Sequence, residues 1–253
     1  MSIKLLRWTS GMAGDTVLKL LLDSDANLQS QNRYIALSDG QSQIDYNYCK
    51  SFKYNQIAEM SLMHAFDVDP IVLFEQLEQL ESDDVTAQWL LKTHCYFDFL
   101  YPVVDITVNA EQMPFVVKAG LHKNSRAKNL LPNYHVLASK ISDPAILYKF
   151  DCFNYAQDLL QTRNYSADQL NLKHILGGWE DFVTALSKVN LNISAHCQTY
   201  YNQWLEENQR FVPSTAYLKL LEQQDFDYNN DKLTIEERYC LLALSKQKFK
   251  ILT

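Results

Sequence analysis

Glycine is scarce in this sequence: its 253 residues include six glycines, where average usage predicts about 18. Proline is equally sparse, also at six. These numbers exclude collagen-like, linker-like and low-complexity chains, and an all-β fold built on many tight turns. A scarce glycine is expected where the backbone requires one. Two of the six, Gly11 and Gly14, fall in one short segment near the N-terminus.

Other absences narrow the class of protein further. The net charge of −7 gives no overall electrostatic reason to bind nucleic acid. The five cysteines are spread along the chain without a CxxC pair, a pattern typical of reduced thiols in the cytoplasm. The sequence has neither a secretory leader pattern nor an apolar run of the roughly 18 residues that a membrane span needs. We therefore expect a cytoplasmic protein with no membrane partner, and we assign no metal.

Strand patterns concentrate in the first half of the chain and helical patterns in the second. Apolar runs predict strands, the Asp69-Pro70 start and apolar periodicity predict helices, and Ser166/Gln169 and Thr234/Glu237 have the spacing of capping boxes. The predicted strands are residues 3–8, 34–37, 88–91 with its end at Lys92-Thr93-His94, and 103–108. The predicted helices begin at Val17 and cover 54–64, 69–80, 179–188, 193–208 and 214–224. This order predicts an α/β fold with a mostly parallel sheet, a P-loop-like strand–turn–helix start and a helix-rich C-terminal half. We expect one domain, 1–253, with a sheet-forming cofactor half at 1–130 and a helical elaboration at 131–253.

The turn between the first strand and the first helix is a candidate phosphate site. A strand–turn–helix unit directs backbone N–H groups and a helix N-terminus at one point, where an anion is stabilised. The candidate ligands in this turn are Ser10, Gly11, Gly14, Asp15 and Thr16. The GxxxxGK[ST] spacing and its lysine are absent, and Asp15 stabilises the helix but opposes an anion. A tight turn without a ligand is the alternative interpretation.

Lys92-Thr93-His94 follows an apolar strand and is the second candidate site. Residues two apart on a strand share a face, and ligands of open α/β sheets bind at the carboxyl ends of strands. Lys92 there can stabilise charge on a transferred phosphoryl or sulfuryl group, and His94 can accept a proton from an attacking hydroxyl. The alternative is a solvent-exposed lysine beside a histidine in the core.

Together the two segments resemble the sulfotransferase family, whose members use 3′-phosphoadenosine 5′-phosphosulfate as donor. Members open with a strand, a loop of the form Lys-Ser-Gly-Thr-Thr-Trp and a helix, and residues 12–17 here keep the glycine and the second threonine of that loop. Many members carry a Lys-Thr-His motif with a catalytic histidine and a supporting lysine, which residues 92–94 match. Residues 103–110 are similar to the following strand, which supports the donor's 3′-phosphate. The resemblance covers roughly residues 3–120 and implies sulfuryl transfer.

Three positions depart from the family pattern. Met12 stands at the loop lysine, and Val108 and Val116 stand at the usual arginine and serine ligands of the 3′-phosphate. The most basic stretch of the chain follows and comprises Lys118, His122, Lys123, Arg126 and Lys128. On a helix, its members at four-residue spacing share a face, so Lys118 and Arg126 could bind the 3′-phosphate or an acidic acceptor; a solvated helix face is the alternative. Asp105 could orient His94 or face a loop.

These observations support hypotheses of different classes. The first is a sulfotransferase-like enzyme with His94 and Lys92 as catalytic residues and an unidentified hydroxyl or amine acceptor. The second is a non-catalytic member of the same fold that binds a nucleotide, a phosphorylated ligand or a protein, because the customary ligands are missing. A kinase-like P-loop transferase is a third, disfavoured because the turn has no lysine. The acceptor and the oligomeric state are left open by the sequence.

Overall fold

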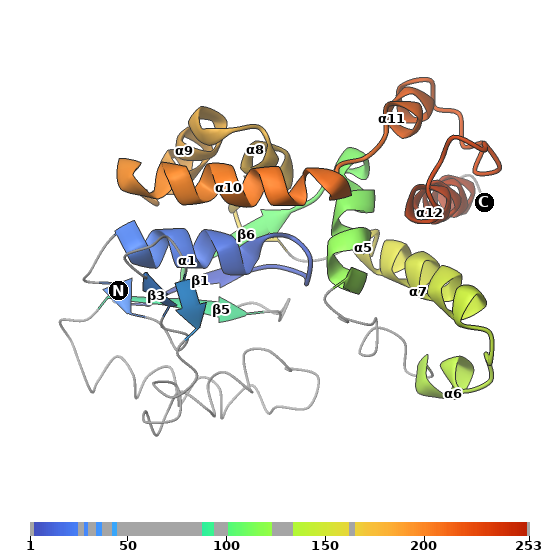
Figure 1. Ribbon diagram of the computed structural model, residues 1–253, viewed down its shortest axis with the longest axis horizontal. Coiled ribbons are helices and arrows are strands. Elements are labelled where there is room, and N and C mark those ends of the chain that lie inside the picture. The colour runs from blue at the N-terminus through green and yellow to red at the C-terminus, as the bar shows by residue number, and fades with distance from the viewer. Residues whose placement is uncertain are drawn as a thin grey trace. The chain divides into compact units, whose positions relative to one another are not determined.

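The structure is a computed structural model that describes residues 3–24, 28–29, 34–36, 42–44, 88–93, 101–122, 134–161 and 165–251 (Figure 1). The chain divides into two compact units, and both are discontinuous in sequence. Unit 1 comprises Met1–Thr9, Ala13–Thr107 and Asn164–Glu207, and unit 2 comprises Ser10–Met12, Val108–Arg163 and Asn208–Thr253. Within the described ranges, no helix is both long and apolar enough to cross a membrane.

Unit 1 contains a parallel sheet with the strand order β2-β5-β1-β6-β7. Its strands are β1 (Ile3–Arg7), β2 (Leu28–Gln29), β5 (Gln88–Thr93), β6 (Val103–Thr107) and β7 (Asp168–Asn171). Every adjacent pair is parallel, and β2 adds only two residues to the edge of the other four strands. A separate antiparallel pair consists of β3 (Tyr34–Ala36) and β4 (Ser42–Ile44). The predicted α/β fold with a parallel sheet and a strand–helix start is confirmed.

The central strands form where the sequence is continuously apolar. Leu5 and Leu6 of β1 and Leu91 of β5 are fully buried, and every residue of β6 is buried, with at most 9% exposed. Strands covered on both faces are rich in apolar side chains, which explains why these runs predicted strands correctly, although each strand also contains a charged residue. The helices predicted at 54–64 and 69–80 lie outside the described residues.

Strand β7 corrects the expectation of a helical start near Ser166. The predicted Ser166/Gln169 capping box is wrong, because Ser166 Oγ donates to the carbonyl of Asp168 and the segment pairs with β6. Only Leu170 of this strand is buried. A polar strand with one buried residue lacks the apolar signal on which the sequence argument depended, and its pairing with β6 decides its structure.

Among its described residues, unit 1 has four α-helices and one short 3₁₀ helix beside the sheet. They are α1 (Gly14–Ser24), α8 (Leu172–Leu176), α9 (Trp179–Lys188), η2 (Ala195–Cys197) and α10 (Gln198–Asn208). Helix α9 has the predicted bounds, whereas the helix predicted from residue 193 begins later, after the 3₁₀ turn. Figure 1 shows α1 and α10 side by side above the sheet, and Tyr201 of α10 stacks on Phe182 of α9 with ring centroids 5.1 Å apart.

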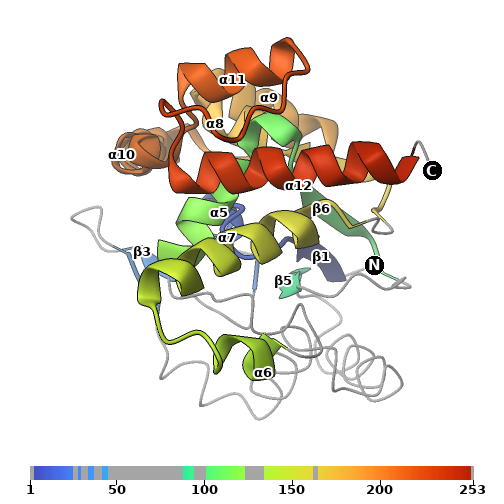
Figure 2. The same ribbon diagram turned by 90° about the vertical axis from the view of Figure 1, so that its right-hand side faces the viewer.

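Unit 2 is helical. Its elements are η1 (Ala110–Gln112), α5 (Met113–His122), α6 (Tyr134–Ala138), α7 (Pro144–Leu159), η3 (Gln209–Phe211), α11 (Thr215–Glu222) and α12 (Ile235–Ile251). Helices α7 and α12 run in the same direction (Figure 2). Near their starts the hydroxyl of Tyr148 donates to Glu236, and further along Gln157 donates to the carbonyl of Ala243. The predicted Thr234/Glu237 capping box is confirmed, with Glu237 N donating to Thr234 Oγ1 and Thr234 N to Glu237 Oε2.

Candidate functional site

The strand order places a topological switch point at the carboxyl ends of β1 and β6. After β1 the chain continues to β2 on one side of the sheet, and after β6 it returns as β7 on the other side. In open parallel sheets, ligands bind in the crevice that such diverging connections leave at the carboxyl ends. The predicted turn at residues 9–14 leaves β1 at this end, so the candidate site begins where the fold favours one.

The turn has an irregular backbone that leads directly into α1. Gly11 and Ala13 have positive φ angles of 86° and 60°, and Val17 N donates to the carbonyl of Ala13 at 3.0 Å. The helix therefore begins at Gly14, three residues before Val17. The first N–H groups of a helix have no intrahelical acceptor, and here they belong to residues of the turn that the sequence analysis named. Asp15 is exposed at this end and Thr16 is half-buried.

Both glycines of the turn are required by packing. A Cβ on Gly14 would lie 2.0 Å from the indole ring of Trp8, which is itself buried. Within unit 2, a Cβ on Gly11 would lie 2.5 Å from the carbonyl oxygen of Val116 and 2.9 Å from Gly120 N. Close approach of a phosphate is therefore not needed to explain why glycine stands at either position.

Two other turn residues are also held by the protein. Ser10 accepts a hydrogen bond of 2.5 Å through its carbonyl oxygen from the hydroxyl of Tyr155. Met12, at the position of the family's loop lysine, is fully buried. The side chain at that position thus contributes to the core, and any ligand charge must be met by backbone N–H groups, Thr16 or residues from another element.

The lysine of the Lys-Thr-His segment lies in the strand next to β1. In the register of the sheet, Lys92 is opposite Leu6 and Thr93 is opposite Arg7, so β5 ends beside the end of β1. The backbone arrangement brings Lys92 to the carboxyl edge where the sequence analysis expected it. His94, the predicted catalytic base, lies outside the described residues.

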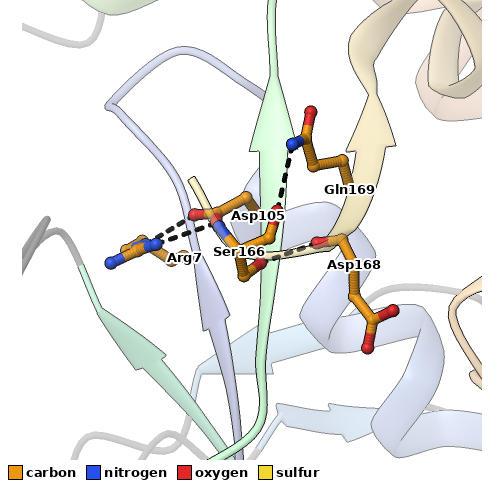
Figure 3. A network of polar contacts seen from close by, with 5 residues as sticks. All are labelled: Arg7, Asp105, Ser166, Asp168 and Gln169. Atoms are coloured by element: carbon orange, nitrogen blue, oxygen red, sulfur yellow. Dashed lines mark hydrogen bonds and ion pairs between the residues drawn. The ribbon is translucent and has the colours of Figure 1, made fainter. Parts of the chain in front are cut away.

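A buried ion pair joins the last residue of β1 to the middle of β6, and the sequence analysis did not identify it (Figure 3). Arg7 Nε donates to Asp105 Oδ1 at 2.5 Å and Arg7 Nη2 donates to Oδ2 at 2.8 Å. Ser166 N donates to the same Oδ2 at 2.5 Å. Asp105 is fully buried and Arg7 is 3% exposed. The Asp105 carboxylate, which the sequence analysis named for orienting His94 or facing a loop, accepts hydrogen bonds from Arg7 and Ser166.

The sequence alone does not predict that Arg7 and Asp105 form a pair. Arg7 is the last residue of β1 and Asp105 is the central residue of β6, and the register places them directly opposite one another. Sequence position gives no reason to pair residues so far apart, because it does not show that β1 and β6 are neighbours. Bidentate geometry and burial identify the pair as structural.

The structure describes only part of the predicted basic face. Lys118 is half-buried on α5, and His122 is exposed at the last position of that helix. Arg126 lies outside the described residues. Gly11 lies against the side of α5 formed by Val116 and Gly120, whereas His122 contacts Phe211 on another side. The structure does not bring His122 to the glycine turn.

A second unexpected cation lies on α1. Lys19 is 4% exposed, and its Nζ lies 3.1 Å from the ring centroid of Tyr200 without a hydrogen-bond partner among the described residues. Burial lowers the pKa of Lys19 from 10.5 to about 8, against the opposing effects of Asp23 and Cys197. The ammonium is therefore a destabilising charge that the aromatic ring offsets in part.

We expect Lys19→Met to raise the free energy of unfolding at pH 7 by up to about 3 kcal/mol, because the pKa of Lys19 falls from 10.5 to about 8 and each unit corresponds to about 1.4 kcal/mol. The unfolded chain holds the Lys19 proton up to about pH 10.5 and the folded chain only to about pH 8, so the wild type gains stability with rising pH in that window relative to the variant. Urea denaturation of both proteins from pH 7 to 10 measures this difference. A constant difference across the window would contradict the shifted pKa.

Comparison with known proteins assigns this chain to no family. No model of a known protein family matches the chain, no curated protein matches its sequence, and no solved structure matches its fold. What stands is the α/β fold with its parallel sheet and the geometry of the carboxyl edge.

Proposed function

We propose that this chain is a sulfotransferase-like protein that binds a 3′-phosphoadenosine 5′-phosphosulfate donor at the carboxyl edge of the sheet. One observation carries the proposal: β1, which leads into the Gly11–Thr16 turn, is paired with β5, which carries Lys92 at its end. A helix N-terminus and a cationic strand end at adjacent central strands provide complementary charge for a phosphosulfate group.

The proposed reaction assigns one role to each residue. Backbone N–H groups at the start of α1 and the hydroxyl of Thr16 bind the phosphosulfate. His94 takes the proton from the acceptor hydroxyl or amine while the new bond to sulfur forms, and the bond between sulfur and the phosphate oxygen breaks. Lys92 stabilises the negative charge that develops on that oxygen, and adenosine 3′,5′-bisphosphate leaves.

A second candidate is a non-catalytic protein of the same fold that binds a nucleotide or another phosphorylated ligand. The buried side chain of Met12 favours it, since the lysine that contacts the phosphosulfate in the family is replaced here by a core residue. Both candidates place a ligand at the same edge and differ in whether a sulfuryl group is transferred.

Calorimetric titration with adenosine 3′,5′-bisphosphate tests the shared part of the proposal. We expect saturable binding by the wild type and a loss of about tenfold or more in affinity for Thr16→Ala and for Lys92→Ala, because a hydrogen bond to a charged group contributes about 1.5–3 kcal/mol. Lys188→Ala, an exposed lysine at the end of α9, is the matched control and should bind as the wild type does. Absence of binding by the wild type would overturn the sulfotransferase-like candidate.

Transfer of labelled sulfate from the donor to a panel of phenols, alcohols and amines separates the two candidates. Transfer that His94→Ala abolishes while bisphosphate binding is retained supports the enzyme. Binding without transfer to any acceptor favours the non-catalytic protein.

A further inference from the structure

Two basic side chains meet in unit 2 without an acidic partner among the residues that the structure describes. Arg210 Nη2 of η3 lies 3.3 Å from His122 Nε2 at the end of α5. No carboxylate within the described ranges forms an ion pair with either side chain. Because a guanidinium only donates hydrogen bonds, His122 Nε2 is the acceptor in this contact, and the exposed positive charge is that of Arg210, on a chain with a net charge of −7.

One aromatic ring positions both side chains. The buried ring of Phe211 lies 4.7 Å from Arg210 Cζ and 5.4 Å from the centre of the His122 ring. Phe115 of α5 packs its ring against Phe211 edge to face, with centroids 6.1 Å apart. A guanidinium and an imidazole that are already held against a core ring lose little conformational entropy when a ligand binds.

We propose that His122 and Arg210 form a binding site for phosphate or a phosphate monoester. The guanidinium presents several N–H donors and can contact two oxygens of one phosphate, and the imidazole donates when its hydrogen lies on the nitrogen that faces the anion. Lys118, one helical turn before His122 on α5, adds positive charge from the same side of the helix. Such a dianion neutralises charge that the described residues leave uncompensated.

This site is separate from the one proposed for the sulfuryl donor. Within α5, Gly11 lies against Val116 and Gly120, while Phe115 and His122 contact Phe211. Residues 115 and 122 are seven apart and share a helix face, whereas residues 116 and 120 lie between about a quarter and nearly half a turn away. The variants that test the two sites are different, so failure of one proposal leaves the other to be judged on its own result.

Titration of the isotope-labelled full chain with inorganic phosphate tests the proposal by nuclear magnetic resonance. We expect the imidazole signals of His122, assigned with His122→Gln, to shift and saturate with a dissociation constant on the order of 1 mM, typical of a few polar contacts. Sodium chloride at the same ionic strength should give no saturable shift, and His174 and His196 serve as internal references.

Arg210→Gln should weaken phosphate binding at least tenfold, and Arg210→Lys should give an intermediate result because it keeps the charge but loses the planar fork. Arg238→Gln is the matched control, because Arg238 of the same unit already pairs with Asp231 at 3.7 Å, and its substitution should leave phosphate binding unchanged. Shifts that chloride reproduces, or equal weakening by Arg238→Gln, would overturn the proposal. The amide spectrum of each variant shows whether it is folded, and Arg210→Lys decides the question if Arg210→Gln is not.

Discussion

Asp105→Ala is expected to lower the free energy of unfolding by about 3–5 kcal/mol, which is typical of removing one partner from a buried ion pair. The substitution would leave the guanidinium of Arg7, 3% exposed, without the carboxylate that accepts two of its hydrogen bonds. It would also remove the acceptor of Ser166 N, which ties the start of β7 to β6. Urea denaturation followed by far-UV circular dichroism measures the loss.

Two comparisons separate burial of charge from simple loss of contacts. Asp231→Ala removes the fully exposed partner of Arg238 and should change stability by less than about 1 kcal/mol. The double substitution Arg7→Met with Asp105→Leu removes both charges and should be markedly more stable than Asp105→Ala alone. Equal destabilisation by the single and double substitutions would show that shape, rather than uncompensated charge, dominates at this position.

Gly14→Ala is expected to destabilise the protein by about 3 kcal/mol, at the upper end of what overpacking a core usually costs. The added Cβ would lie 2.0 Å from the ring of Trp8, whose side chain is 1% exposed and cannot move into solvent. Helix propensity acts in the opposite direction, since alanine is favoured over glycine by roughly 1 kcal/mol inside a helix. The steric effect should exceed it, and thermal or urea unfolding measures the sum.

Gly178→Ala is the control for Gly14→Ala. Gly178 has a φ of 110°, but no atom lies within 4 Å of the position that a Cβ would take. Its substitution should show the strain of the backbone alone, on the order of 1–3 kcal/mol. Trp8→Leu in the Gly14→Ala background should recover part of the stability, with a coupling energy of at least about 1 kcal/mol in a double-mutant cycle. Additive effects would contradict a direct clash.

The Gly14 result also bears on how activity data are interpreted. A loss of ligand binding in Gly14→Ala would follow from displacement of Trp8 alone, so it would not identify the turn as the ligand site. Thr16→Ala is the better test of ligand binding at the turn. Thr16 lies two residues after the start of α1 and is half-buried, and the substitution only removes atoms.

The strands that the sequence predicted are those whose local pattern determines their structure. The apolar runs of β1, β5 and β6 would be buried in almost any arrangement, so a prediction from hydrophobicity alone was sufficient. The capping box at Thr234 and Glu237 is similarly local, since both hydrogen bonds span three residues. Strand β7 failed because its stability comes from pairing with β6 and not from its own composition.

The site was predictable only as a set of separate segments. The glycine turn and Lys92 could each be named, and the register then placed β1 and β5 side by side. The sequence suggested that Gly11 and Gly14 allow close approach of a ligand. The structure shows that a side chain at Gly14 would clash with Trp8, and one at Gly11 with α5. Arg7 and Arg210 carried no sequence signal, because the partners that give them a role, Asp105 and His122, are about 90 residues or more away.

The sequence by itself determined the fold class, the strand–turn–helix start and the places where charged residues interrupt apolar runs, because these depend on contacts between near neighbours in the chain. The tertiary structure alone decided the strand order, the Arg7–Asp105 pair and the contact between Arg210 and His122 in unit 2. The physical reason is that a buried charge is stabilised by whatever group packing places within hydrogen-bond distance, and separation along the chain does not limit that choice.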